Sequence, residues 1–421
     1  QHLNEEQNRK CAGIRTLSIW DPLNIIYKLY CLQRVRKKRI IDMAKVALIT
    51  YHRAHNNGSF LQAFATQQAI ENLGHQCDVI DFSTPKQQYV YDVYKKIRTP
   101  KDVLKNCYAF LNRKIIQKRH DDFDTLINNN LNLTKHFYQD VLEMGDLESQ
   151  YDIFLSGSDQ IWNMDAWDYD DAYCLSFVKN KPKVSYASSL GGHILDRLDN
   201  TALADKYRNL LSSYKEIGVR EQSAKQYLDL VLDREVTQVL DPTLLLTEHE
   251  YERISAPRLV DEPYIFYYAI DNIELNESAA RAVQEFSRKT MLPVYVIFTG
   301  NKSLELTKFG FNVLKVAAPN HYLSMIKHAE YVLSASFHGT AFSINFQKQF
   351  YVVRGKKNGK LNLDDRMTSL LRLGGLENRQ LSEGNSWDDN VIDYGTVNTK
   401  ISKEAERSKR FLKRELAYAG K

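Results

Sequence analysis

The stretch of sequence that decides the fold runs from one short apolar segment to the next, Tyr331-Val332-Leu333-Ser334-Ala335-Ser336-Phe337-His338-Gly339-Thr340-Ala341-Phe342. This order of apolar and small polar residues is typical of a strand, a tight turn and a helix. A helix N-terminus favours an anion, because it carries partial positive charge and unpaired N–H donors. A histidine there can also exchange a proton near neutral pH. The stretch therefore predicts anion binding and acid–base chemistry around His338 or, more simply, turn and cap chemistry alone.

The same alternation continues outward along the chain. Short apolar runs have the form of buried parallel strands, and amphipathic segments lie between them. Strands are predicted at 46–51, 77–82, 151–155, 183–187, 216–219, 236–240, 264–270, 293–298, 313–316, 331–334 and 350–353. Helices are predicted at 60–73, 202–214, 221–230, 274–289, 321–328, 340–345 and 399–418. We therefore expect an α/β fold with two doubly wound, Rossmann-like domains that face a cleft. Ligands should bind outside the carboxyl ends of the strands.

Length and composition agree with two domains. A chain of 421 residues is longer than one ordinary core requires. Its 43% hydrophobic and 26% charged residues are typical of a globular protein. We expect a first domain at 43–240 with a helical insertion at about 86–150, a second domain at 241–398 and a C-terminal helix at 399–421.

Residues 1–42 differ from the rest of the chain in their charge. They hold nine basic and four acidic residues and so carry the whole net charge of +5. The balanced remainder disfavours generic nucleic-acid binding, which needs a basic face. An apolar, aromatic run followed by a basic run fits an amphipathic helix on an anionic membrane. The other interpretation, which we favour, is an extension without a function.

The cysteine pattern points to a reducing compartment. Five scattered cysteines form no CxxC pair, and no His/Cys cluster has zinc spacing. We therefore expect free thiols, no metal site and a cytoplasmic protein, which could lie against the inner face of the membrane. No run approaches the roughly 20 apolar residues of a transmembrane helix. Histidines outside the loops discussed below, His120 among them, are interpreted as surface or core residues.

The first polar loop, at 51–59, offers two histidines, an arginine, two amides and a glycine before a helix. It is neither GxGxxG nor a P-loop, so it lacks a nucleotide fingerprint. Its position in a βαβ unit favours substrate contact by His52, Arg53, Asn57 and Gly58. The simpler alternative is Asn-Gly turn chemistry.

A second loop follows the strand at 151–155, with the sequence Ser156-Gly157-Ser158-Asp159-Gln160-Ile161-Trp162-Asn163. Small residues would let a ligand approach backbone N–H groups, and Asp159 could accept sugar hydroxyls. The alternative is that Ser158 or Asp159 caps a helix, and Trp162 is expected in the core.

A third loop places Arg220 at a strand end, before Glu221. An arginine there can bind a carboxylate or phosphate through two parallel hydrogen bonds. The alternative is an ion pair with Glu221 that contributes little. Because the strand end should face the cleft, we favour a functional role.

Together these segments resemble the polysaccharide pyruvyl transferase family. The matching segments are 49–63, 80–82, 156–163, 186–189, 219–221, 240–245 and 334–342, in order over nearly the whole chain outside the extension. The resemblance implies a two-domain fold similar to GT-B glycosyltransferases. It implies transfer of a pyruvyl group from phosphoenolpyruvate to a sugar of a surface polysaccharide or its lipid-linked precursor, with a ketal as the usual product and no cofactor.

The resemblance also implies roles for particular residues. Arg220 and His338 match the family residues associated with donor binding and catalysis. The remaining substrate contacts are expected at His52, Arg53, Asn57, Gly58, Gln62, Ser156, Gly157, Ser158, Asp159, Ser336, Gly339, Thr340 and Arg366.

The chain departs from the family pattern at two places. Asn57 stands where an aromatic residue usually precedes the glycine, and Ser336 and Phe337 stand where some members carry a basic residue. Fewer cations would surround the donor phosphate, so Arg53 or Arg366 would have to substitute. Two other readings remain open, a nucleotide-sugar glycosyltransferase of GT-B type and a non-catalytic carbohydrate-binding protein.

Overall fold

The computed structural model describes residues 43–269, 277–334, 336–353, 356–357, 360–361, 365–384 and 386–417. The predicted extension at 1–42 lies outside the described residues, as do Ala335, the end of the strand predicted at 264–270 and the start of the helix predicted at 274–289. Residues 44–419 form one compact unit, so the division into domains at residue 240 stays a prediction.

The first sheet has six strands, all parallel, in the order β2-β1-β3-β4-β5-β6. The strands are β1 (Lys45–Ile49), β2 (Gln76–Val79), β3 (Ile153–Ser156), β4 (Lys183–Ser188), β5 (Glu216–Val219) and β6 (Thr237–Gln238). Its helices are α3 (Asn57–Asn72), α7 (Thr201–Leu211) and α8 (Gln222–Leu232). All six strands fall where apolar runs predict them.

The second sheet repeats this construction with the strand order β14-β11-β10-β7-β8-β9, again all parallel. The strands are β7 (Ile265–Tyr268), β8 (Val294–Ile297), β9 (Asn312–Leu314), β10 (Tyr331–Ser334), β11 (Gln349–Val353) and β14 (Gln380–Leu381). Its helices are α9 (Glu248–Glu252), α10 (Glu277–Thr290), α11 (Asn301–Leu304), α12 (Pro319–His328), α13 (Phe337–Asn345) and α14 (Asp365–Gly374). A short hairpin pairs β12 (Lys356–Lys357) with β13 (Lys360–Leu361).

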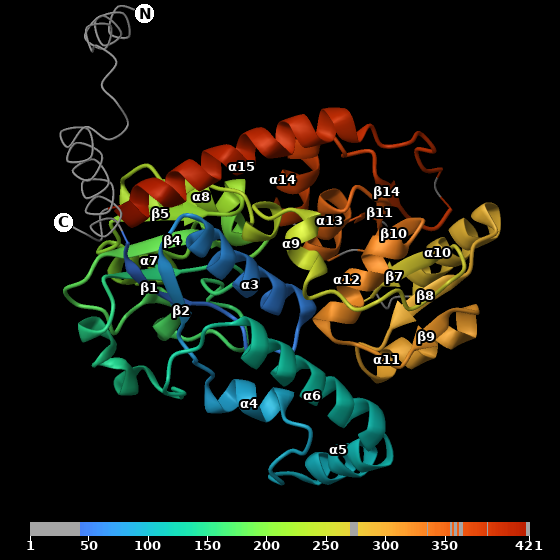
Figure 1. Ribbon diagram of the computed structural model, residues 1–421, viewed down its shortest axis with the longest axis horizontal. Coiled ribbons are helices and arrows are strands. Elements are labelled where there is room, and N and C mark those ends of the chain that lie inside the picture. The colour runs from blue at the N-terminus through green and yellow to red at the C-terminus, as the bar shows by residue number, and fades with distance from the viewer. Residues whose placement is uncertain are drawn as a thin grey trace, which may run out of the picture. The chain divides into compact units, whose positions relative to one another are not determined.

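The predicted fold class is confirmed, because two parallel sheets of six strands each alternate with helices (Figure 1). The sequence missed α14 and β14, as well as the short elements α9, α11, β12 and β13. The strand β14 has only two residues, too few for a periodic pattern to indicate a strand.

Helices also occupy the predicted insertion, at the lower edge of Figure 1: α4 (Pro85–Tyr91), α5 (Pro100–Leu111) and α6 (Arg113–Asn130). The C-terminal helix α15 (Tyr394–Leu416) begins five residues before the predicted start, where Asp393 caps it. It returns to the first sheet, and its Ser408 accepts a hydrogen bond from the Leu240 N–H at 2.8 Å.

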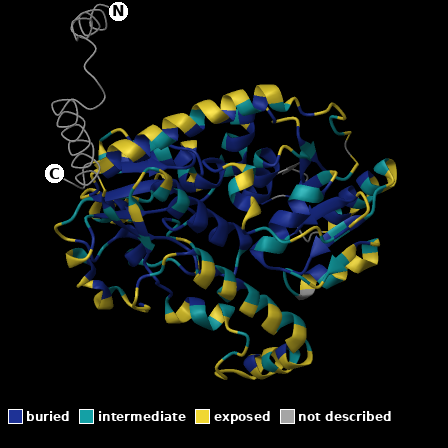
Figure 2. Cartoon of the chain, in the orientation of Figure 1, coloured by how far each residue is buried: buried dark blue, intermediate teal, exposed yellow. Residues whose placement is uncertain are grey.

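The central strands are buried, whereas exposed residues lie along the outer faces of the helices (Figure 2). Parallel strands covered by helices on both faces require continuous apolar runs, which explains why their positions could be predicted. Within the part of the chain that the structure describes, no helix has the length and apolar character needed to cross a membrane.

Candidate active site

The first loop is shorter than predicted, because α3 begins at Asn57 rather than at the start of the predicted 60–73 helix. The Asn56 side chain caps it by accepting hydrogen bonds from the N–H groups of Gly58 and Ser59 at 2.9 and 3.3 Å. Asn57 and Gly58 therefore lie in the first helical turn, after the carboxyl end of β1.

The helix α13 also begins three residues before its predicted start, at Phe337. Ser336 is its cap and accepts a hydrogen bond from the Gly339 N–H at 3.4 Å. His338 is therefore part of the first helical turn rather than of the turn before it. A small residue is needed at Gly339, since a Cβ there would lie 2.5 Å from the Ser334 hydroxyl oxygen.

The first turns of α3 and α13 meet. A Cβ on Gly58 would lie 2.2 Å from His338 Nδ1, so only glycine lets the imidazole lie against α3. Asn57 donates a hydrogen bond to the Tyr268 hydroxyl at 3.2 Å, which joins the same helix start to β7. Residues of the two sheets thus form one site.

One carboxylate lies between the two predicted catalytic residues. Arg220 Nη1 donates to Asp241 Oδ2 at 2.8 Å, and His338 Nε2 is 3.7 Å from the same oxygen. The guanidinium of Arg220 also lies 4.3 Å from the ring centroid of Phe337. Thr243 donates to the other oxygen of Asp241 through its N–H and hydroxyl, which fixes that carboxylate.

Several buried polar atoms at this point have no hydrogen bond: Arg220 Nε and Nη2, Glu221 Oε2, His338 Nε2, Thr340 Oγ1 and Asn57 Oδ1. Of these, Arg220 Nε and Glu221 Oε2 lie 3.8 Å apart and form the expected ion pair. Buried donors and acceptors in folded proteins are nearly always paired, because an unpaired one costs free energy. Their concentration here indicates a place where a polar ligand supplies the missing partners.

Charges around the site shift its titratable groups. Burial lowers the pKa of His338 below its ordinary value, although Asp241 and Asp159 act in the opposite direction, so the imidazole is neutral at pH 7. Burial raises the pKa of Asp241, but the charges of protonated His338 and of Arg220 and the hydrogen bonds from Thr243 and Arg220 outweigh it, so the pKa is lowered. At pH 7, where His338 is neutral, Arg220 and Thr243 keep the carboxyl ionised. Burial also raises the pKa of Glu221 to about 6, even though Arg220 is adjacent.

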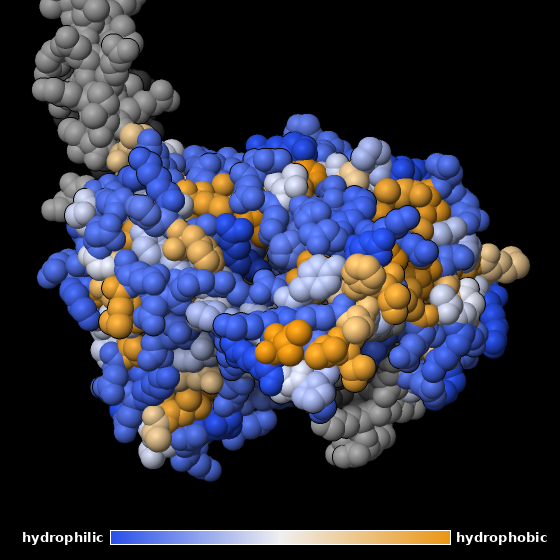
Figure 3. Space-filling view, turned by 90° about the horizontal axis from the view of Figure 1, so that it is seen from below, coloured by the Kyte–Doolittle hydropathy of each residue, from blue (hydrophilic) through white to orange (hydrophobic). Residues whose placement is uncertain are grey.

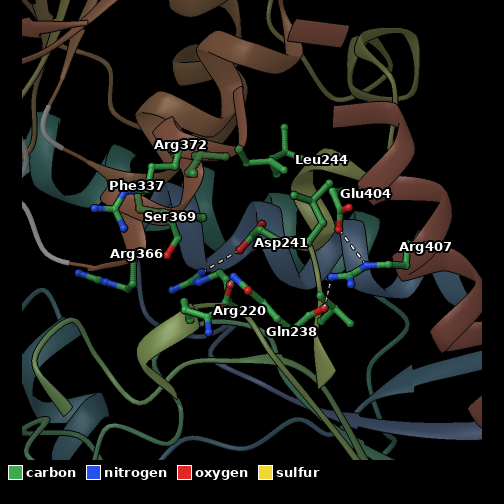
Figure 4. Close-up of a pocket in the computed structure, with 15 residues that line it drawn as sticks. Arg220, Gln238, Asp241, Leu244, Phe337, Arg366, Ser369, Arg372, Glu404 and Arg407 are labelled. Atoms are coloured by element: carbon green, nitrogen blue, oxygen red, sulfur yellow. Dashed lines mark hydrogen bonds and ion pairs between the residues drawn. The ribbon is translucent and has the colours of Figure 1, made fainter. Parts of the chain in front are cut away.

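A cavity of about 340 Å³ opens beside Arg220 and Phe337. Its charged lining comprises Arg220, Arg366, Arg372, Arg407, Asp241 and Glu404 (Figure 4). In that view Arg220 reaches toward Asp241 in the centre, and Arg407 pairs with Glu404 to one side. The cavity therefore has more positive than negative side chains and suits an anion.

His52 and Arg53 point elsewhere. Arg53 donates through Nε and Nη2 to both oxygens of Asp81, each at 2.7 Å, and the His52 ring lies 3.1 Å from the same carboxylate. Burial would raise the pKa of Asp81, but these two partners lower it to about 2. The guanidinium of Arg53 is thus neutralised and offers no free cation to a donor phosphate.

The second loop and Gln62 form a hydrogen-bonded framework under the site. Gln62 donates to Thr50 Oγ1 at 2.8 Å and accepts from the Ser158 N–H at 3.1 Å. Asp159 accepts from the Ser59 hydroxyl at 2.8 Å, and Ser158 Oγ lies 3.4 Å from Asp241 Oδ2. These contacts join the first two loops to Asp241.

The start of the second loop is packed against the core. Ser156 donates to the Tyr173 carbonyl at 2.6 Å, and Trp162, fully buried as expected, donates to Ser156 at 3.1 Å. Gly157 has a φ of +130°, and a Cβ there would lie 2.0 Å from the Tyr186 carbonyl oxygen. These contacts give Ser156, Gly157 and Trp162 roles in the packing of the loop. Contact of Ser156 and Gly157 with the substrate stays a prediction.

Sequence reasoning missed Asp241 and Arg372 as site residues. Asp241 stands in an Asp-Pro-Thr segment at the start of a turn, a common cap pattern, although the same segment contributes to the family resemblance. Arg372 belongs to α14, the helix that was not predicted. No pattern along the chain could have shown that either lies near Arg220.

Comparison with known proteins gives fold neighbours and a family. No curated protein sequence matches the chain. Solved structures similar in fold include S. aureus MnaA with UDP, at 12% identity and a TM-score of 0.48, covering 87% of this chain and 90% of that one. UDP-GlcNAc 2-epimerase from Methanocaldococcus jannaschii has 10% identity, a TM-score of 0.48 and coverage of 87% and 99%. Anabaena Alr3699/HepE with UDP and glucose has 9% identity, a TM-score of 0.46 and coverage of 87% and 95%. Such distant likenesses carry no argument about activity.

The sequence match is more informative. The family model "Polysaccharide pyruvyl transferase" matches residues 56–356, which is most of the chain and spans both sheets. It includes Arg220, Asp241 and His338, the three residues that meet in the structure. The chain therefore belongs to the polysaccharide pyruvyl transferase family and is a transferase enzyme.

Proposed function

We propose that this protein transfers the pyruvyl group of phosphoenolpyruvate to a sugar of a surface polysaccharide or its lipid-linked precursor, forming a ketal and releasing phosphate. Membership of the family supports the reaction class. The observation that supports this site most is that Arg220 and His338 approach the same Asp241 oxygen, while Arg220 Nε and Nη2 and His338 Nε2 are buried without a hydrogen bond.

The donor carries a carboxylate and a phosphate, so its site needs cations and oriented N–H donors. The free edge of Arg220 has two parallel N–H groups, the geometry that binds a planar carboxylate or a phosphate through two hydrogen bonds. The first turn of α13, with Ser336 and Thr340, would bind the other anionic group. Arg366, which lines the adjoining cavity, is the additional cation in this proposal.

His338 is the proposed acid–base residue. Ketal formation joins two sugar hydroxyls to C2 of the donor. The first hydroxyl adds to C2 as C3 gains a proton, and the second replaces phosphate, so each hydroxyl loses a proton and the second proton leaves with phosphate. A neutral imidazole with an unpaired Nε2 can accept the hydroxyl proton. Asp241, whose oxygen is 3.7 Å away, would stabilise the resulting imidazolium. We propose that the transfer itself uses no cofactor.

We place the reaction in the cytoplasm, with the lipid-linked acceptor at the inner membrane face. The described cysteines, Cys77, Cys107 and Cys174, are all free thiols, which is compatible with a reducing compartment. A polysaccharide acceptor is in keeping with the family.

The test measures phosphate released from phosphoenolpyruvate in the presence of galactosides, glucosides and mannosides. Release that requires one acceptor class would support pyruvyl transfer and identify the sugar. No release with any acceptor, combined with thermal stabilisation by UDP but not by phosphoenolpyruvate, would favour glycosyl transfer instead.

A further inference from the structure

A second group of polar side chains lies where the helical insertion meets the first loop. His55 lies between β1 and α3, whereas His120 and Asp124 are four residues apart on α6 and share one helix face. His55 Nε2 lies 3.1 Å from Asp124 Oδ1, and His120 Nδ1 lies 3.3 Å from Asp124 Oδ2. All three ligand atoms lie within 4.8 Å of one another. His120, interpreted from the sequence as a surface or core residue, is therefore one of three polar side chains that meet here.

The surroundings hold these rings in place. His55 is only 6% exposed and stacks on Phe123 with ring centroids 5.2 Å apart. The His120 ring meets it edge-on at 4.5 Å. Arg119 donates to the His55 carbonyl at 2.6 Å, which fixes the backbone as well. Two segments more than 60 residues apart are thus joined at one point.

A metal ion needs neutral imidazole and ionised carboxylate as ligands. His55, His120 and Asp124 bring these two kinds of ligand to one point.

The distances also suit a metal ion. Zinc binds histidine nitrogen and carboxylate oxygen at about 2.0–2.2 Å in tetrahedral geometry, which places neighbouring ligand atoms roughly 3.4 Å apart. His55 Nε2 is 3.1 Å from Asp124 Oδ1 and His120 Nδ1 is 3.3 Å from Asp124 Oδ2, so each nitrogen lies near that spacing from a different oxygen of the carboxylate. His120 and Asp124 are partly exposed. Figure 3 views the molecule from below, on a face where hydrophilic surface is interrupted by hydrophobic patches. An ion and a coordinating water could enter at His120 and Asp124.

We propose that His55, His120 and Asp124 bind one divalent transition-metal ion, with Zn²⁺ as the best match. The ion would join α6 of the insertion to the loop that starts α3. Gly58, three residues after His55, lies against His338, so the ion would stabilise one wall of the active site. It takes no part in the transfer, and the proposal does not depend on the reaction assigned above.

The experiment uses the full, untagged chain after removal of metal with a chelator. Zinc is titrated by calorimetry, and Co²⁺ is added in parallel to observe the absorption bands of a coordinated ion. We expect one Zn²⁺ per chain. Asp124→Asn keeps an oxygen that can accept hydrogen bonds but loses the charged ligand, so its zinc affinity should fall at least about 100-fold.

Asp122→Asn is the matched control, because Asp122 lies on the same helix and pairs with Lys118 at 2.8 Å. It should bind zinc as the wild type does. His120→Ala repeats the test at a second ligand in case Asp124→Asn does not fold. If the wild type binds no more zinc than these ligand variants, the three side chains are a hydrogen-bonded cluster only, and the proposal is wrong.

Discussion

Two arginines at strand ends of the first sheet look equally suited to bind a substrate anion, yet the structure separates them. Arg53 uses its Nε and Nη2 groups to bind both oxygens of Asp81. Arg220 binds Asp241 through Nη1, and its buried Nε and Nη2 groups make no hydrogen bond, although Nε lies 3.8 Å from Glu221 Oε2. An arginine at a strand end is therefore a strong site candidate only when its own carboxylate partner leaves that edge free.

The largest expected effect concerns His338, which approaches the same Asp241 oxygen as Arg220. If His338 is the acid–base residue, His338→Ala should lower turnover by about 10²–10⁴-fold, which is the usual contribution of such a group. The readout is acceptor-dependent phosphate release. His249→Ala is the control, because His249 has a side chain that is 92% exposed. Turnover near wild type in His338→Ala would remove His338 from the mechanism.

Gly58→Ala should displace His338 without removing it. The new Cβ would lie 2.2 Å from His338 Nδ1, so the ring must move, and a displacement of about 1 Å can lower kcat by roughly 10²-fold. Gly145→Ala meets no atom within 4 Å and should leave kcat unchanged. Equal kcat values for the two variants would show that the position of the imidazole does not limit the reaction.

Asp81, the carboxylate partner of Arg53, should stabilise the fold in a pH-dependent way. Its pKa of about 2 is below the ordinary 3.8, so it contributes about 2 kcal/mol above pH 4 that is lost as the pH falls toward 2. Urea unfolding of wild type and Asp81→Asn at pH 6 and pH 3 should show the stability difference shrinking in acid. A difference that does not change with pH would contradict the assignment.

Glu221, next to Arg220, should change the stability of the fold with pH in the direction opposite to Asp81. Its pKa of about 6 is above the ordinary 4.5, so the folded state binds its proton more tightly than the unfolded state does. The fold should lose at most about 2 kcal/mol as the pH rises through this range. Glu221→Gln mimics the protonated form, so it should gain stability relative to wild type between pH 5 and pH 7. If the stability difference between Glu221→Gln and wild type stays constant over that range, the raised pKa is contradicted.

The sequence was sufficient for the architecture because buried parallel strands need continuous apolar runs, which are visible one strand at a time. It also indicated Arg220 and His338, since each follows the end of a predicted strand, although His338 lies in the first turn of α13. It could not show that Arg53 is paired on its Nε/Nη2 edge, because its partner Asp81 is 28 residues away along the chain. For the same reason it could not bring His55 together with His120, or Asp241 with His338, which are joined only by the fold.

The most direct test compares the two arginines by titrating phosphoenolpyruvate into wild type, Arg220→Lys and Arg53→Lys. Lysine keeps the charge but loses the two parallel N–H groups. Hydrogen bonds to charged groups contribute about 1.5–3 kcal/mol, so Arg220→Lys should weaken binding about 10–100-fold. Arg53→Lys should bind phosphoenolpyruvate like the wild type and lose stability instead. Unchanged affinity in Arg220→Lys, or a larger loss in Arg53→Lys, would contradict the assignment of the donor site to the free edge of Arg220.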